Sequence, residues 1–393
     1  MTARPQITFD DTEVAFEARS VEDLRRAYWL YKALGSPWMA TMGPKLLLAA
    51  VRMHLPVESI VRATIFRQFC GGESIDGCNG TIADLARFKI GTILDYSVEG
   101  KETEEDFDRT RDEILQIVEY AAGDPNIPFA VFKVTGLGCY GLLEKVQRGE
   151  QLSEDEETQW AGFRGRVETI CEAGSLAAVP VLIDAEESWI QGAIDALVAE
   201  MMARFNRETV IVYNTIQMYR ADRLDFLRAS LAQARADGYR VGIKLVRGAY
   251  MEKERERAEA MGYPSPIHTD KDSSDVAFNE ALKCLMAEID RVGICCGSHN
   301  ETSTDYLASL MADAGLSAGD ERIYFSQLLG MSDHISYNLA RLGYNVTKYV
   351  PYGPIREVVP YLVRRAEENT SIAGQTGREL ALLIRELERR GES

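Results

Sequence analysis

Residues 179–217 read VPVLIDAEESWIQGAIDALVAEMMARFNRETVIVYNTIQ, and this stretch decides the fold. It starts with an apolar run that ends at Asp184, continues as a long helical stretch, and returns to a β-branched run that ends at Gln217. Near-continuous apolar strands joined by a helix are typical of a parallel sheet that is buried on both faces. The stretch therefore predicts a strand, a crossover helix and a second parallel strand.

The same alternation of strand and helix extends outward in both directions. Short apolar or β-branched runs begin near residues 89, 129, 179, 208, 240, 292, 322 and 345, and amphipathic stretches follow them. Eight such units predict an α/β fold, a closed (β/α)8 TIM-like barrel, with a doubly wound open sheet as the structural alternative.

Polar side chains collect where these predicted strands end. In a parallel barrel the carboxyl ends of the strands and their loops form the mouth that holds the active site. The residues in this position are Lys133, Asp184, Gln217, Arg247, His299, Gln327 and Tyr349.

The N-terminal part of the chain has a different texture. Apolar residues recur at intervals of three and four in 21–34, 44–53 and 57–72, which predicts helices. We therefore expect an N-terminal helical segment over 1–80 and a barrel over 81–393. The charged stretch 144–160 predicts a solvated helical excursion.

Composition excludes several classes of function. The 61 acidic residues exceed the 44 basic ones by 17, a balance unlike that of nucleic-acid binders, which need cationic cover for phosphates. Seven cysteines without a CxxC pair predict core thiols rather than disulfides, and four scattered histidines predict no metal site. No apolar run approaches the roughly 20 residues of a membrane span. The N-terminus resembles neither a signal nor a transit peptide, which predicts a cytoplasmic protein.

Two motifs allow more than one interpretation. GLGCYG at 136–141 matches a dinucleotide-binding GxGxxG, but no acidic residue ends a strand about 20 positions later, so a flexible barrel loop is favoured. Lys133 and Lys244 lie within predicted strands, where a buried ammonium needs a partner. Either could form a Schiff base, but an ion pair of Lys133 with Asp184 is the favoured interpretation.

Two further motifs indicate anion binding. KLVRGAY, 244–250, puts cations, a glycine and an aromatic ring at one strand end, and Gly248 lets a planar ligand or phosphate approach the backbone. Arg364 and Arg365 follow the eighth strand on a predicted helix, with Glu368 one turn later. Adjacent guanidiniums suit a carboxylate ligand, and barrels often bind anions at this position.

Taken together, these motifs resemble the proline dehydrogenases, a family of FAD-dependent (β/α)8 enzymes. FKVTGL, IDAEES, KLVRGAY, GSHN, FSQLLGM, YVPYG and YLVRRAEEN resemble the family's signatures in the family's order. The resemblance covers about 60% of the chain, from about 133 to 369. The chain resembles the single-function form, because no aldehyde dehydrogenase domain follows.

The resemblance implies an FAD site, a proline site and a set of catalytic residues. The cofactor-binding residues that it implies are Asp184, Ala185, Gln217, Lys244, Val246, Arg247, Gly248, Lys271, His299, Asn300 and Gln327. The substrate-binding residues that it implies are Lys133, Leu245, Tyr250, Tyr349, Tyr361, Arg364, Arg365 and Glu368, with Arg364 and Arg365 on the proline carboxylate. Of these, Lys133, Asp184, Tyr349, Arg364 and Arg365 are the expected catalytic residues.

By the same resemblance, L-proline passes a hydride from C5 to N5 of FAD and becomes Δ1-pyrroline-5-carboxylate. Electrons would pass on to a quinone-type acceptor. The protein would be cytoplasmic, and peripheral association with the inner membrane stays open. Lys244 and Arg247 exchange the family's arginine and lysine in KLVRGAY, which leaves the charge but changes the hydrogen-bond geometry. Tyr349 stands where hydroxyproline-preferring relatives carry a smaller residue, which favours proline.

Two other functions remain open at this stage. A Schiff-base aldolase would use Lys133 or Lys244 covalently in the same barrel. A ligand-sensing module would bind flavin or a metabolite without turnover, with the apolar stripe of the last helix, 378–390, as a docking surface.

Overall fold

The structure is a computed structural model that describes residues 7–35, 42–43, 46–48, 50, 53, 55–98, 102–371 and 375–392. Half of the residues of the helix predicted over 44–53 lie outside this described part of the chain. The helix predicted over 21–34 is confirmed. The helix predicted over 57–72 is also present, but it is shorter, from Glu58 to Phe69, and contains a π-helical turn at Arg62–Phe66. Among the described residues, no helix combines the length and the apolar character needed to cross a bilayer.

All eight predicted strands are present, and their order closes a parallel barrel in which β8 lies beside β1. The predicted (β/α)8 fold is confirmed. The strands are β1 (Ile90–Tyr96), β2 (Phe129–Lys133), β3 (Val181–Asp184), β4 (Val212–Gln217), β5 (Val241–Val246), β6 (Val292–Gly297), β7 (Ile323–Leu328) and β8 (Val346–Tyr352).

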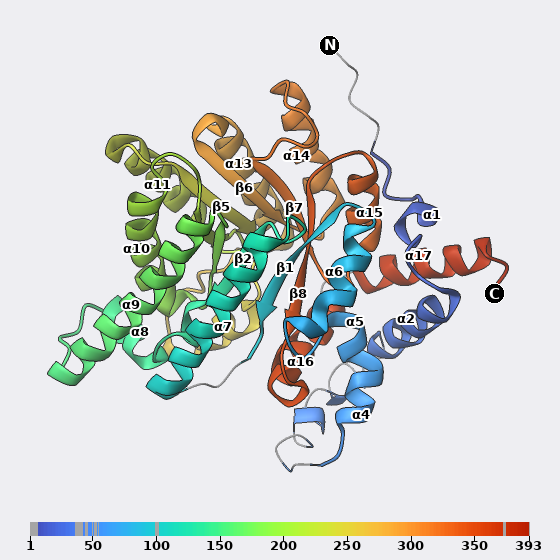
Figure 1. The fold of residues 1–393 in the computed structure, drawn as a ribbon, viewed down its shortest axis with the longest axis horizontal. Helices are drawn as coiled ribbons and strands as arrows, with labels where there is room; N and C mark the ends of the chain where they lie inside the picture. The colour runs from blue at the N-terminus through green and yellow to red at the C-terminus, as the bar shows by residue number, and fades with distance from the viewer. Residues whose placement is uncertain are drawn as a thin grey trace. The chain divides into compact units, whose positions relative to one another are not determined.

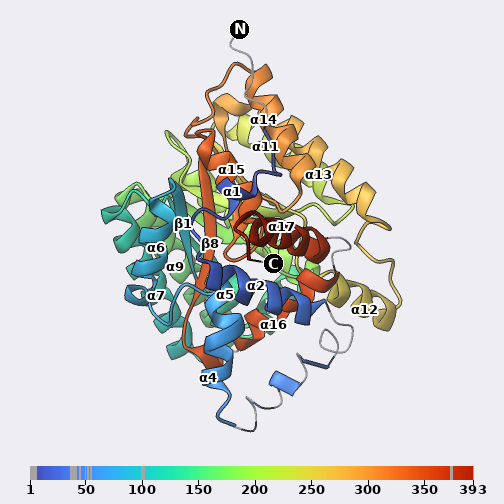
Figure 2. The ribbon, with the colours of Figure 1, turned by 90° about the vertical axis from the view of Figure 1, so that its right-hand side faces the viewer.

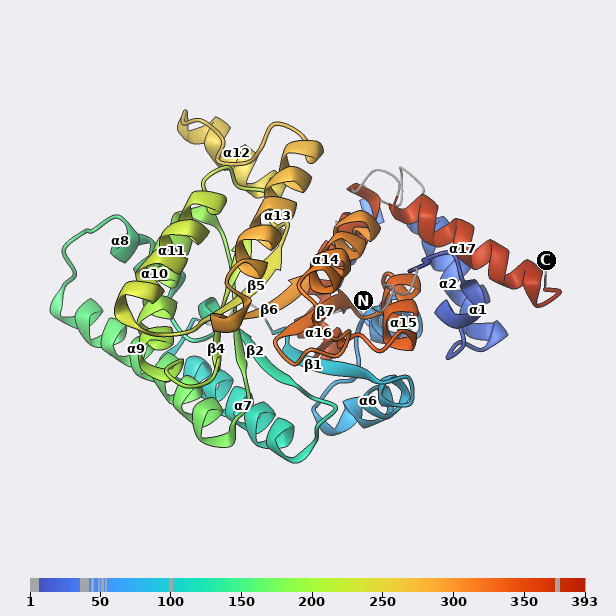
Figure 3. The same ribbon diagram turned by 90° about the horizontal axis from the view of Figure 1, so that it is seen from above.

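The chain divides into two compact units, one made of residues 1–99 and 327–393 and the other of residues 100–326. The central unit, 100–326, carries β2 to β6 and most of β7, with neighbouring strands in parallel register. Figure 3 shows α10 and α11 on the outside of its strands. Its helices are α7 (Glu104–Gly123), α8 (Tyr140–Gln147), α9 (Glu154–Ala177), α10 (Ser188–Phe205), α11 (Arg223–Asp237), α12 (Met251–Met261), α13 (Lys271–Met286) and α14 (Glu301–Asp313).

The charged stretch 144–160 is helical, as predicted, but it is interrupted. It contains the end of α8, a loop over 148–153 and the start of α9 (Figure 1). Ser153 begins α9 with a capping box: its hydroxyl accepts from the backbone N–H of Glu156, and the Glu156 carboxylate accepts from the backbone N–H of Ser153. Such reciprocal caps stabilise a helix start by satisfying two amide groups that would otherwise lack partners.

The terminal unit, residues 1–99 and 327–393, combines both ends of the chain with β1 and β8. Figures 1 and 2 show α17 beside α2. Most of the apolar stripe of α17 is covered rather than free for docking, because Leu383 and Leu387 pack in one cluster with Leu24 and Tyr31. Ile384 is the exception and is 39% exposed. Its helices are α1 (Thr12–Ala15), α2 (Val21–Leu34), α4 (Glu58–Val61), α5 (Arg67–Phe69), α6 (Asn79–Ala86), α15 (Asp333–Arg341), α16 (Ile355–Ser371) and α17 (Gln375–Arg389).

The cysteines follow the prediction with one exception. All seven are free thiols, and five of them are buried. Cys139 is exposed, so the prediction that every cysteine is a core residue is wrong at this position. It is the residue that caps the start of α8, in the connection that follows β2.

Candidate active site

Asp184, at the end of β3, lies between Lys133 of the neighbouring strand β2 and Lys244 of β5, the next strand but one. Its Oδ1 is 2.7 Å from Nζ of Lys244, and its Oδ2 is 3.5 Å from Nζ of Lys133. The predicted ion pair of Lys133 with Asp184 is confirmed, although Lys244 is the closer partner. The parallel register aligns Lys133 with Asp184, so both side chains point to the same face of the sheet.

Aromatic rings fill the barrel on the amino-terminal side of this cluster. Phe129 meets Tyr213 and Tyr324 edge to face, with ring centroids 5.5 and 4.9 Å apart. Gly242 and Gly293 make room for Tyr213, since a Cβ on Gly293 would lie 2.3 Å from the Tyr213 hydroxyl. Because side chains alternate along a strand, this packing directs Lys133 and Lys244 inward at the carboxyl end of the barrel strands.

Leu245 follows Lys244 and is completely buried. Alternation along β5 directs it to the opposite face from Lys244. A contact of Leu245 with the substrate, as the sequence predicts, would therefore lie away from the lysine cluster. Tyr250 lies farther along the same connection and is the residue that precedes α12.

Arg247, just after β5, is held by three side chains. Its Nε lies 2.6 Å from Oδ1 of Asp275, and its two Nη atoms donate at 2.9 Å to the hydroxyls of Ser298 and Ser303. A guanidinium has five N–H donors, so two of them remain for a ligand. The face of the guanidinium also lies over the ring of Phe278.

Asp275 joins Arg247 to two more of the predicted residues. Its Oδ2 is 2.5 Å from Nζ of Lys271 and accepts a long hydrogen bond, 3.5 Å, from Nδ2 of Asn300. Burial alone would raise the pKa of Asp275, but the Lys271 hydrogen bond and the Arg247 charge outweigh burial and hold the pKa below its usual value. Asn300 also caps α14 through its Oδ1, which places the neighbouring His299 at the same strand end.

Gly248 and Gln217 shape the loop that follows β5. Gly248 has a φ of +138°, and a Cβ there would lie 2.4 Å from the Tyr219 ring, so only glycine fits. Gln217 donates from Nε2 to the backbone oxygen of Glu186 at 2.6 Å. Ala185 lies between Asp184 and Glu186 and is buried, whereas Val246 is half-buried at the end of β5.

This donor set fits an anionic dinucleotide such as FAD. Lysine and arginine side chains suit a pyrophosphate, and amide groups suit the carbonyl and N–H edge of a flavin ring. The residues that would hold it in the central unit are Asp184, Ala185, Gln217, Lys244, Val246, Arg247, Gly248, Lys271, His299 and Asn300. Among the described residues no His, Cys, Asp and Glu group has the arrangement of a metal site.

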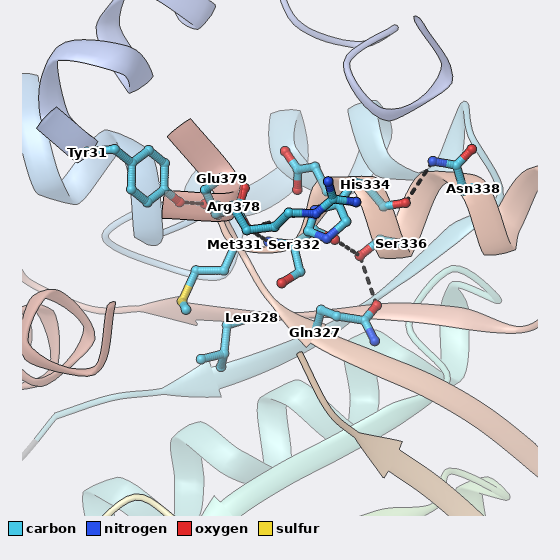
Figure 4. A network of polar contacts seen from close by, with 12 residues as sticks. Tyr31, Gln327, Leu328, Met331, Ser332, His334, Ser336, Asn338, Arg378 and Glu379 are labelled. Atoms are coloured by element: carbon cyan, nitrogen blue, oxygen red, sulfur yellow. Dashed lines mark hydrogen bonds and ion pairs between the residues drawn. The ribbon is translucent and has the colours of Figure 1, made fainter. Parts of the chain in front are cut away.

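In the terminal unit, Gln327 is oriented by α15. Figure 4 shows Ser336 reaching toward it, and the Ser336 hydroxyl lies 2.9 Å from Gln327 Oε1 and 3.2 Å from the backbone oxygen of Ser332. The backbone N–H of Ser332 in turn donates to Glu379 on α17 at 2.5 Å. Gln327 is thus connected to the C-terminal helix through two serines.

The remaining predicted residues of the terminal unit lie on β8 and α16. Tyr349 is buried on β8. On α16, Tyr361 and Arg365 are buried and Arg364 is half-buried, with the Arg365 guanidinium 5.0 Å from the centre of the Tyr361 ring. The side chain of Glu368 lies outside the described part of the structure.

Sequence reasoning missed two acidic residues beside the predicted ones. Glu186 is buried and accepts hydrogen bonds from Thr135, and Asp275 bridges Arg247 and Lys271. The signal for Glu186 was present, because it is an acidic residue directly after a strand that ends in Asp184. Asp275 gave no such signal, since it lies within a helix whose contact with β5 depends on the tertiary fold.

Known proteins with similar sequences point to one family. The sequence profile of the proline dehydrogenase family matches residues 78–378. The carbapenem antibiotics biosynthesis protein CarD of Pectobacterium carotovorum is 34% identical over 82% of this chain and 83% of its own length. The mitochondrial proline dehydrogenase 1 of Dictyostelium discoideum is 29% identical over 97% of this chain and 74% of its own length.

Among solved structures, proline utilization A (PutA) from Bdellovibrio bacteriovorus, inactivated by N-propargylglycine, matches with a TM-score of 0.73. The match has 19% identity and covers 97% of this chain but only 42% of that one, so this chain spans less than half of that protein. This likeness concerns the fold alone. The family profile, however, covers most of the chain and the motifs at the strand ends, and the chain belongs to the proline dehydrogenase family.

Proposed function

We propose that the chain oxidises L-proline to Δ1-pyrroline-5-carboxylate with FAD. The oxidation removes a hydride from C5 and a proton from the ring nitrogen, and a C=N double bond forms between these atoms. Bound FAD would supply the hydride acceptor, N5, and a path for the electrons to a quinone-type acceptor, which can lie at a membrane surface. The observation that carries the proposal is the Lys133–Asp184–Lys244 cluster at the strand ends, in a chain of this family.

The polar groups of the chain orient the reactants and need not transfer many protons. Orientation of a bound substrate can supply a large part of a rate enhancement. We expect Arg364 and Arg365 to bind the substrate carboxylate, which leaves the ring free to present C5. Tyr349 and Tyr361 add buried aromatic surface, and the size of Tyr349 favours proline over hydroxyproline.

The aldolase alternative does not fit the two lysines. A carboxylate beside a lysine holds its Nζ in an ion pair, whereas Schiff-base formation requires the amine to attack a carbonyl. Lys133 and Lys244 both lie against Asp184. Borohydride trapping with a carbonyl substrate would detect a Schiff base and is expected to label neither lysine.

The direct test is an anaerobic titration. The purified protein should carry flavin, and L-proline should bleach its absorbance in the absence of oxygen. Reoxidation by a soluble quinone should restore the colour and yield one Δ1-pyrroline-5-carboxylate per two electrons. A protein that binds no flavin, or a flavin that proline does not reduce, would refute the proposal.

The arginine pair gives a more specific prediction. Arg364→Met or Arg365→Met should raise the KM for proline about 10- to 100-fold, because each removes a charge-assisted hydrogen bond to the carboxylate. Steady-state kinetics with the flavin content of each variant measured would check this. Arg356→Met is the matched control, since Arg356 lies on the same helix but pairs with the exposed Glu58. An unchanged KM in both test variants would refute carboxylate binding by these arginines.

A further inference from the structure

One row of hydrogen bonds ties together the carboxyl ends of four consecutive strands. Thr135 follows β2 and donates from its backbone N and its Oγ1 to the two carboxylate oxygens of Glu186, at 3.0 and 2.7 Å. Gln217, which ends β4, donates to the backbone oxygen of Glu186 at 2.6 Å. The backbone N of Ala249, after β5, approaches Oε1 of Gln217 at 3.4 Å. We call these four residues the rim chain.

Glu186 is the titratable member of the rim chain. It is buried, and its own backbone N donates to Gln191 on α10. Charged groups surround it on several elements. They are Lys133 on β2, Asp184 on β3, Glu187 in the loop after β3, Asp195 on α10, which Gln191 contacts, and Lys253 on α12, which pairs with Glu187.

Electrostatic attraction explains why an acid suits this position. Lys133 and Lys244 both lie against the carboxylate of Asp184, and the charge of Lys133 also acts on Glu186. Protonation of Glu186 removes one negative charge near Lys133, which is costly at a partly buried site.

Glu186 changes charge in the neutral range. Burial raises its pKa to about 7, and the two hydrogen bonds from Thr135 and the charge of Lys133 keep it from rising further. Protonation also turns one carboxylate oxygen into a donor, so Thr135 must accept where it had donated. Protonation of Glu186 therefore changes both the charge near Lys133 and the direction of the hydrogen bonds with Thr135.

We propose that Glu186 is a positioning residue for the oxidation of proline and that the competent form of the site is the one in which its carboxylate holds Thr135 and balances the charge of Lys133. This inference rests on the proposed function. It assigns to the second acidic residue of the IDAEES motif a role separate from that of Asp184. Glu186 acts through Lys133 and the rim chain, not by direct contact with the substrate.

The pH profile of kcat/KM for L-proline tests the proposal. In the wild type, kcat/KM should decrease as pH drops below about 7. The profile also contains the deprotonation of the proline amine, which is the same for all variants. Glu186→Gln should remove this fall and lower kcat/KM at pH 8 by roughly tenfold, because one charge next to Lys133 is missing. Thr135→Val should move the fall to higher pH, because it removes a donor that favours the carboxylate.

Glu187→Gln is the matched control. Glu187 neighbours Glu186 in sequence but pairs with Lys253, whose side chain is mostly exposed. The control should keep the fall but move it to lower pH, because the charge of Glu187 helps to raise the pKa of Glu186. If Glu186→Gln also keeps it, or if Thr135→Val leaves it in place, Glu186 does not control the site and the proposal is wrong.

Thermal unfolding of the holoprotein provides a readout that does not depend on turnover. Because the pKa of Glu186 is higher in the folded state, its contribution to stability is present at acid pH and is lost as pH rises from about 4.5 to about 7. The Tm of Glu186→Gln minus that of the wild type should therefore increase over this interval and then stay constant. A constant difference would contradict the titration of Glu186. If the wild type does not oxidise proline, the proposed function fails, while this measurement still tests Glu186.

Discussion

Asp333→Asn is expected to lower the free energy of unfolding by about 3–5 kcal/mol, the usual cost when one partner of a buried ion pair is removed. Asp333 begins α15, and its Oδ1 lies 2.8 Å from Nζ of Lys348 while its Oδ2 lies 3.0 Å from Nη2 of Arg19. Lys348 is 1% exposed, so water cannot replace the lost carboxylate. Chemical denaturation at pH 7 measures the change.

The same residue makes stability depend on acid. Burial alone would raise the pKa of Asp333, but Lys348 and Arg19 outweigh burial and lower it to about 2. A pKa that is lowered on folding adds stability above the unfolded value, about 3.9, and this stability is lost as pH falls through about 2. The difference between wild type and Asp333→Asn should therefore shrink between pH 4 and pH 2.

Asp225→Asn is the control for this experiment. Asp225 pairs with Arg228 on the surface and is 86% exposed, so its replacement should change stability by less than about 0.5 kcal/mol. The double variant Asp333→Asn with Lys348→Met removes both buried charges and should recover part of the loss. Equal stability of Asp333→Asn and wild type would show that the buried pair contributes nothing net.

Local patterns in the sequence were sufficient to predict the barrel. Strands buried on both faces must be almost entirely apolar, so the runs that end at Asp184 and Gln217 could be found without tertiary information. The ion pair of Lys133 with Asp184 was also predictable, because a lysine within an apolar strand requires a partner on a neighbouring strand. Lys348, in the run NVTKYVPYG, carries the same signal, and in the fold it pairs with Asp333.

The contacts that sequence did not predict depend on strand register or on distant segments. Lys244 lies nearer to Asp184 than Lys133 does. This difference depends on how β3, β4 and β5 are aligned, which the sequence does not show. Arg19 meets Asp333 across 314 positions of sequence, and no local pattern encodes such a pairing. Glu186 was overlooked because an acid after a strand resembles a solvated loop residue until its burial is known.

Asp333 and Asp184 share one arrangement, a carboxylate between two cations, but they lie in different environments. Asp333 joins the N-terminal residue Arg19 to β8 and α15, and its carboxylate pairs with Arg19 and Lys348, neither of which is predicted to bind proline or FAD. Asp184 lies between two lysines at the strand ends of the central unit. Loss of the first carboxylate should therefore reduce mainly stability, whereas loss of the second should reduce mainly activity.

Asp184→Asn is accordingly expected to lower kcat/KM for proline by at least about 100-fold, because Lys133 and Lys244 would repel each other without the carboxylate and leave their positions. Stopped-flow reduction of the flavin by proline, with flavin content measured in parallel, separates loss of cofactor from slow reduction. Asp222→Asn is the control, since Asp222 follows β4 but is half exposed and pairs with Arg220 and Arg223.

A second substitution distinguishes charge balance from a simple loss of packing. Lys244→Met in the Asp184→Asn background removes one of the two ammonium groups that repel each other, so the double variant should unfold at a higher temperature than Asp184→Asn alone. If packing were the cause, the two changes would add and the double variant would be the less stable one. Activity should stay low in both, because neither restores the carboxylate that holds Lys133. A fully active Asp184→Asn enzyme would contradict the role of this carboxylate.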